Sequence, residues 1–154
     1  MKPIVASALL VAVVAVLGGA FPVQASAADP PADRVLVMYF HRTERCPTCR
    51  KMGSYAEEAV KTGFAEQVRD GTVGFYYVDF QDERNAALAK GYSVTGPALI
   101  VARVVDNQVA KAGNLQEIWT KVRDKEAFFK YVQGHVAAML NWTPESAGAG
   151  QPRR

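Results

Sequence analysis

The stretch that decides how this chain folds is His41-Arg42-Thr43-Glu44-Arg45-Cys46-Pro47-Thr48-Cys49-Arg50-Lys51. It holds both cysteines of the 154-residue sequence, in a Cys-x-x-Cys arrangement. An unbroken apolar run, residues 35–40, comes directly before it, and a segment with helical spacing follows. A strand that leads into two cysteines at the start of a helix predicts a thiol redox site.

The first 27 residues have the features of a secretory signal peptide. Lys2 supplies a positive charge, residues 4–20 are almost entirely apolar, and Pro22 ends that run. Ala25-Ser26-Ala27 has the small-residue pattern of a cleavage site, so we predict cleavage after Ala27 and export to the periplasm or the medium. The alternative is an uncleaved N-terminal membrane anchor, because the 17-residue run reaches the lower limit of about 17–25 residues for a spanning helix.

The single cysteine pair is expected to be chemically active rather than structural. Disulfides persist outside the cytoplasm, where an exported chain would be found. A bond between residues only three apart, however, removes little chain entropy from the unfolded state, so it is a poor stabiliser. Covalent haem attachment is excluded, because Arg50 and not histidine follows Cys49.

Charge and composition exclude some kinds of partner. The net charge of +3 is too small to indicate a nucleic-acid ligand, and none is expected. We expect a monomer whose partners are protein disulfides or dithiols, together with a membrane or exported electron donor or acceptor. No cofactor is expected beyond a redox-active Cys46–Cys49 disulfide.

The rest of the chain predicts one domain of alternating strands and helices, residues 34–142. Residues 28–33 contain two prolines and are expected to be an extended lead-in, while the small, polar residues 143–154 are expected to be a disordered tail. Strands are predicted at residues 34–40, 72–79, 98–105 and 108–112. Helices are predicted at residues 47–62, 64–69, 82–90, 115–122 and 124–140.

This order of elements resembles the thioredoxin core over roughly residues 34–140. The resemblance implies an α/β thioredoxin-like fold, a central mixed four-stranded sheet flanked by helices in the order βαβαββα. Cys46-Pro47-Thr48-Cys49 lies at the first strand-to-helix junction, as in that family, and Gly96-Pro97 lies just before the third strand. The family carries a cis-proline there that faces the cysteines, which implies a cis Gly96–Pro97 bond and an exposed backbone for pairing with a partner.

Two shorter stretches resemble a narrower group. His41-Arg42-Thr43 with Arg45-Cys46-Pro47-Thr48-Cys49, and Ile118-Trp119 before Asp124-Lys125-Glu126-Ala127-Phe128, are similar to the small thioredoxin-like proteins of the ArsF family, nitrophenyl compound nitroreductase subunits. This resemblance implies a third role for the chain, an accessory subunit that passes electrons to a reductase.

The two cysteines are expected to have different roles. Cys46 lies at or near the helix N-cap, where free N–H groups and the helix dipole favour an anion, and Pro47 suits the first turn. Arg42, Arg45, Arg50 and Lys51 lie close by and are expected to lower the pKa of Cys46 further. Cys46 is therefore the predicted nucleophile and Cys49, one turn into the helix, the resolving thiol of a mixed-disulfide mechanism.

Two features depart from thioredoxin itself. Pro47-Thr48 between the cysteines is similar to glutaredoxins and to oxidising exported members of the superfamily, which implies a potential above the thioredoxin value of about −270 mV. The buried acid that thioredoxin keeps six residues before its first cysteine is replaced here by Phe40. The proton relay of thioredoxin is therefore not expected.

Two questions stay open at this site: the role of His41, and whether the cysteines bind a metal ion. His41 either tunes Cys46 or is a hydrogen-bonded structural residue. With Cys46 and Cys49 it also offers a thiophilic site for Cu(I) or Zn²⁺, so a metal-binding protein is the alternative to an oxidoreductase.

Overall fold

Strand β1 (Arg34–His41) is the apolar run that leads to the cysteines, and it lies inside the sheet. It pairs in parallel with β2 (Val73–Asp79) and antiparallel with β3 (Ala98–Val105). β4 (Gln108–Asn114) follows β3 antiparallel, which gives the order β2-β1-β3-β4. The mixed four-stranded sheet confirms the predicted thioredoxin-like architecture.

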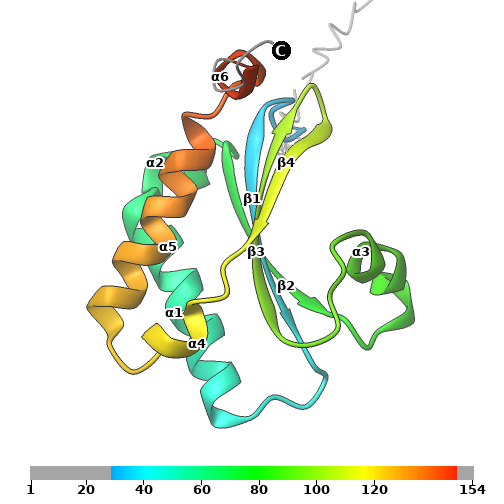
Figure 1. Cartoon of the computed structure of the whole chain (residues 1–154), viewed down its shortest axis with the longest axis vertical. Coiled ribbons are helices and arrows are strands. Elements are labelled where there is room, and N and C mark those ends of the chain that lie inside the picture. Colours follow the sequence, from blue (N-terminus) through cyan, green and yellow to red (C-terminus); the bar gives the residue numbers. More distant parts are fainter. Residues whose placement is uncertain (1–28, 149–154) are drawn as a thin grey trace, which may run out of the picture.

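Helices lie on both faces of this sheet in the computed structural model, which describes residues 29–148 (Figure 1). One face is covered by α1 (Pro47–Gly63), α2 (Ala65–Arg69), α4 (Ile118–Lys121) and α5 (Lys125–Leu140). The opposite face carries a short 3₁₀ turn, η1 (Glu83–Asn85), and α3 (Ala86–Gly91). Within the described residues, every helix is too short or too polar to span a bilayer. The predicted signal peptide, residues 1–27, lies outside them.

Period-two alternation along the strands divides the core into two clusters. Val35, Val37 and Tyr39 of β1 point toward α1 and α5 and are fully buried in the larger cluster. Met38 and Phe40 point to the opposite face and belong to the smaller one. Burial on both faces is the reason that β1 reads as a continuous apolar run.

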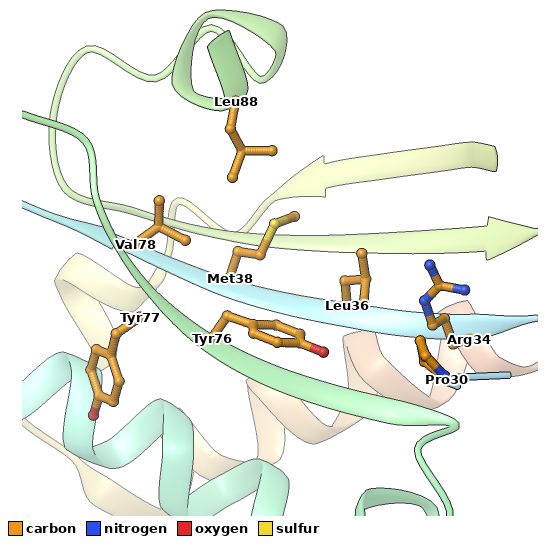
Figure 2. Close-up of a pocket in the computed structure, with 8 residues that line it drawn as sticks. All are labelled: Pro30, Arg34, Leu36, Met38, Tyr76, Tyr77, Val78 and Leu88. Atoms are coloured by element: carbon orange, nitrogen blue, oxygen red, sulfur yellow. The ribbon is translucent and has the colours of Figure 1, made fainter. Parts of the chain in front are cut away.

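The face of the sheet that carries the smaller cluster is only partly covered by α3. This leaves an open apolar hollow of about 370 Å³ (Figure 2). Leu36, Met38 and Val78 point to the side on which Leu88 of α3 lies, whereas Tyr77 points away toward α1. The other lining residues are Pro30, Arg34 and Tyr76. Neither cysteine lines this hollow, so it is separate from the predicted redox site.

The turn between β3 and β4 has the predicted sequence signature. Asp106 and Asn107 have φ angles of 50° and 62°, the left-handed values that a tight hairpin requires. Asp and Asn accept such values more readily than other residues with a side chain.

The C-terminal region differs from the expectation of a disordered tail. Pro144–Gly148 form a short helix, α6. Its start is stabilised by reciprocal hydrogen bonds: the Ser146 N–H donates to Thr143 Oγ1 (3.2 Å) and the Thr143 N–H donates to Ser146 Oγ (3.1 Å). This is a capping arrangement with serine in place of the usual Glu or Gln, and proline suits the first turn that follows. Residues 149–154 lie outside the described residues.

Two helical glycines differ in the space around them. At Gly53 in α1, an added Cβ would lie 2.8 Å from ring carbons of both Tyr39 and Tyr77. At Gly134 in α5, an added Cβ would meet nothing within 4 Å. Gly53 therefore allows α1 to lie close to two aromatic rings of the sheet, whereas Gly134 has no such packing function.

This difference predicts opposite effects for one chemical change. Gly53→Ala should lower the free energy of unfolding by about 1–3 kcal/mol, because the buried methyl group forces the two tyrosine rings aside. Gly134→Ala should raise it by about 0.5–1 kcal/mol through helix propensity alone. Urea unfolding of both variants beside the wild type measures the two effects. Equal stabilisation by both substitutions would contradict the close packing of α1 on Tyr39 and Tyr77.

Candidate active site

Cys46 is the N-cap of α1, as predicted. Its backbone is extended (φ −64°, ψ 161°), Pro47 occupies the first turn, and the Cys49 N–H donates to Cys46 Sγ at 3.2 Å. The backbone N–H of Thr48 also favours the ionised sulfur. The unpaired N–H groups of the first helical turn are therefore directed at the sulfur of Cys46, which is exposed to solvent.

The two sulfur atoms lie 2.7 Å apart, a separation close to that of a disulfide bond, although no bond joins the two cysteines. The pKa of Cys46 is lowered, first by the hydrogen bond from the Cys49 thiol and then by the Cys49 backbone N–H. The pKa of Cys49 is raised, first by burial and then by the bond it makes to Cys46. Cys46 therefore ionises first, and the Cys49 thiol donates to the resulting thiolate.

Cys49 is held in place by a residue for which the sequence predicted only a core position. The Tyr39 hydroxyl donates to the Cys49 carbonyl oxygen at 2.7 Å, and Tyr39 is fully buried. Burial is the main cause that raises the pKa of the Tyr39 hydroxyl, so it remains protonated and a donor. Tyr39 thus joins the end of β1 to the first turn of α1.

Phe40 occupies the position of the thioredoxin acid and is fully buried in the smaller cluster. No Asp, Glu, Lys, Arg or His residue is buried anywhere in residues 29–148. The centre of the Phe40 ring lies 6.1 Å from the centre of the Tyr92 ring, so Phe40 contributes apolar packing. A buried carboxyl group beneath the cysteines is thus absent from the described residues.

A small polar cluster beside the site was also missed by the sequence interpretation. The Tyr77 hydroxyl donates to Glu57 Oε2 at 2.9 Å, and the Arg45 guanidinium lies 5.4 Å from the centre of the Tyr77 ring. Burial and the bond to Glu57 raise the pKa of Tyr77 to about 12. Strand alternation could have found this cluster, because Tyr77 is in register with Tyr39 and both face α1.

His41 is placed as a structural residue. Its Nδ1 lies 2.8 Å from the Arg42 carbonyl oxygen, and its ring packs near Tyr39 and Tyr77 at centroid distances of 6.3 and 6.0 Å. Nδ1 must carry a proton to donate to a carbonyl oxygen. The charge of His41 helps to lower the pKa of Asp79 rather than that of Cys46. These contacts are those of a hydrogen-bonded residue, and an effect of His41 on Cys46 stays a prediction.

The basic residues do not act on Cys46 as a group. Arg50 helps to lower the pKa of Cys46, but it is the smallest of the contributions. The charge of Arg45 acts instead on the two tyrosines, Tyr39 and Tyr77. Hydrogen bonds from the helix start, not the nearby cations, are the main stabilisers of the thiolate.

Gly96 and Pro97 lie at the same end of the sheet as the cysteines. β3 begins at Ala98, which pairs with Phe40 near the end of β1. The predicted cis bond is wrong: residues 29–148 contain no cis peptide, so the Gly96–Pro97 bond is trans. Trans is the intrinsically favoured isomer of an X–Pro bond by about 0.5–1 kcal/mol, and cis requires surrounding contacts that offset this preference. Nothing lies within 4 Å of a Cβ built on Gly96, so the strand entry is open.

A metal site would have to rely on few ligands. No group of three or more His, Cys, Asp or Glu side chains suited to a metal ion occurs in the part of the chain that the structure describes. Cys46 and Cys49 alone would supply two sulfur ligands, a donor set suited to a soft cation such as Cu(I).

The hydrogen bond between the thiols predicts how the reactivity of Cys46 depends on pH. Its alkylation by iodoacetamide should reach half of the maximal rate at a pH below the ordinary pKa of a cysteine, and the rate should fall as the pH drops through that value. Cys49→Ala should move this midpoint upward, because the donor is lost. Cys49→Ser keeps a hydroxyl donor and should move it less. Mass spectrometry of the Cys46 peptide follows the reaction, and equal midpoints in all three proteins would contradict the assigned cause.

Comparison with solved structures returns thioredoxins at low sequence identity. A mutant thioredoxin from Halobacterium salinarum is 20% identical, with a TM-score of 0.42, over 73% of this chain and 80% of that chain. The thioredoxin of Fasciola hepatica is 22% identical (TM-score 0.37; 58% and 79% of the two chains). The oxidised mitochondrial thioredoxin 3 of Saccharomyces cerevisiae is 21% identical (TM-score 0.37; 60% and 79%). No protein-family model and no curated protein matches the chain, and the ArsF resemblance stays a prediction.

Proposed function

We propose that this protein is an exported thiol–disulfide oxidoreductase that uses Cys46 as nucleophile and Cys49 as resolving thiol. The observation that carries the proposal is the pair of sulfur atoms at the start of α1, 2.7 Å apart, whose pKa values are shifted in opposite directions. A lowered pKa makes Cys46 a thiolate at lower pH than a free cysteine. A raised pKa keeps Cys49 protonated until Cys46 has reacted.

The reduction of a partner proceeds in two exchanges. The Cys46 thiolate attacks one sulfur of the partner disulfide, the S–S bond of the partner breaks, and a mixed disulfide between Cys46 and the partner forms. The other sulfur of the attached partner is released as a thiolate, which takes up a proton. Cys49 then loses its proton and attacks Cys46 Sγ in the mixed disulfide, which forms the Cys46–Cys49 bond and releases the second partner thiol. Two electrons pass to the partner in total, and the reverse sequence oxidises a partner dithiol.

The second exchange becomes easier once the first has occurred. In the mixed disulfide Cys46 no longer carries a negative charge, so the charge and the hydrogen bond that raise the pKa of Cys49 are lost. Tyr39 meanwhile keeps Cys49 at its place through the carbonyl oxygen. The arrangement therefore supports a fixed order, with Cys46 first and Cys49 second.

Trapping the intermediate tests the assignment. Cys49→Ser should accumulate a mixed disulfide with an uncharged peptide disulfide, because the resolving step is removed. Cys46→Ser should accumulate none, since Cys49 is partly buried, has the higher pKa and packs against the core. Non-reducing electrophoresis and mass spectrometry identify the adduct and its site.

Two outcomes would decide against this function. Accumulation of the adduct in Cys46→Ser but not in Cys49→Ser would reverse the two roles. A wild-type protein that reduces no disulfide, has no midpoint between about −120 and −270 mV and binds one Cu(I) per chain would replace the oxidoreductase by the metal-binding alternative. The potential and the metal content are measured on the same purified protein.

Export is the part of the proposal that rests on residues 1–27. Cleavage after Ala27 predicts that the protein recovered outside the cytoplasm begins at Ala28, which intact-mass measurement detects directly. A chain that keeps its first residues and sediments with membranes would instead support the anchored alternative.

A further inference from the structure

We propose that four cations around Cys46 select partner proteins whose disulfide is flanked by acidic residues. These cations, the basic rim, are Arg42, Arg45, Arg50 and Lys51. The inference rests on the proposed thiol–disulfide exchange at Cys46 and names the class of partner that it favours.

The first observation is that the basic rim is not neutralised within the chain. Elsewhere in residues 29–148, six basic side chains form ion pairs with carboxylates: Lys61, Arg69, Arg84, Arg103, Lys121 and Lys125. No member of the rim belongs to these pairs within the described residues, and neither do Arg34, Lys90, Lys111, Arg123 and Lys130. The rim differs from these five in its clustering, because all four of its cations lie within five residues of Cys46 in the sequence. Arg42, Arg50 and Lys51 are exposed and Arg45 is half-buried. The stretch thus carries a net positive charge beside its reactive sulfur, opposed by Glu44 and by the Asp79 carboxylate next to Thr43.

The second observation is that the rim side chains are directed to contacts other than the thiolate. Arg50 Nη1 donates to the Arg45 carbonyl oxygen at 2.6 Å, and the Arg45 guanidinium lies over the Tyr77 ring. Lys51 Nζ lies 5.3 Å from the centre of the Tyr55 ring. These contacts hold Arg45, Arg50 and Lys51, and none of them is to a carboxylate. Of the four cations, only Arg50 contributes to the lowered pKa of Cys46.

The third observation is an open hollow beside the cysteine loop. It has a volume of about 550 Å³ and is lined by Arg42, Thr43, Glu44 and Gln81. The Gln81 side chain accepts a hydrogen bond from the Thr43 N–H at 3.1 Å, which fixes the loop that forms one wall. A partner segment whose disulfide reaches Cys46 would place its neighbouring side chains over this hollow and the rim.

Charge complementarity indicates what those neighbouring side chains are. Oppositely charged surfaces speed association and disfavour partners of the same charge, and the effect decreases as salt screens it. A carboxylate beside the partner disulfide meets the rim favourably, whereas a lysine there meets like charge. The rim should therefore act on the rate of the first exchange, in which the two surfaces meet.

Three peptide disulfides that differ only in the residues beside their cysteines test the inference. One carries Glu, one Gln and one Lys, and the rate constant for reduction by the reduced protein is measured for each at about 0.02 M and about 0.5 M salt. The Glu peptide should react about tenfold faster than the Lys peptide at low salt, and the ratio should fall below about threefold at high salt.

A matched pair of variants locates the source of the effect. Arg42→Gln with Lys51→Gln removes two rim charges and should reduce the Glu-to-Lys rate ratio at low salt by at least about threefold. Arg69→Gln with Lys111→Gln removes two charges at the other end of the molecule and should leave the ratio unchanged. Arg69 follows the far end of α1, whose 17 residues span about 25 Å. Lys111 on β4 pairs with Arg103 on β3, and Arg103 pairs with Val35 at the start of β1, away from the cysteines.

The possible results distinguish a failure of the acidic-partner preference from a failure of the proposed thiol–disulfide exchange. Reduction of the Gln peptide with equal rates for the Glu and Lys peptides would overturn the selectivity and leave the oxidoreductase standing. A ratio that the distal pair changes as much as the rim pair would also overturn it, because net charge would then be the cause. A protein that reduces none of the three peptides would overturn both.

Discussion

Cys46 caps the N-terminus of helix α1, and the position of that helix depends on its contact with β1. The Tyr39 hydroxyl reaches the Cys49 carbonyl oxygen from the buried side of the strand, and Gly53 lets the helix lie against the rings of Tyr39 and Tyr77. The free N–H groups of the first turn are directed at Cys46, because Cys46 is the N-cap of this helix. The contact with β1 therefore sets where the two sulfur atoms lie relative to the sheet.

The difference between the two thiols follows from burial and hydrogen bonding more than from charge. Cys46 is exposed at the helix end, whereas Cys49 packs against the larger core cluster. Burial penalises the ionised form of Cys49, and the thiol that stays protonated then donates to Cys46. One geometry therefore lowers one pKa and raises the other, as the proposed exchange mechanism requires.

The lowered pKa of Cys46 does not depend on the nearby cations as a group. It comes first from the Cys49 thiol and then from backbone N–H groups, with Arg50 as the smallest contribution. Within residues 29–148 no acid is buried below the cysteines, because the apolar Phe40 occupies the position where thioredoxin has a titrating group. The site is thus apolar beneath and basic around its rim.

The sequence by itself determined the order of the elements and the place of Cys46 at the helix start, because these depend on local pattern: an apolar run, Cys-x-x-Cys and Pro47. It did not reveal that Tyr39 binds the Cys49 carbonyl oxygen, that Tyr77 binds Glu57, or that Gly96–Pro97 is trans. Each of these depends on which segments meet across the sheet, which spacing along the chain does not encode. The tertiary structure also decided which cations act on the thiolate, because an electrostatic effect depends on distance and on competing hydrogen bonds rather than on proximity in sequence.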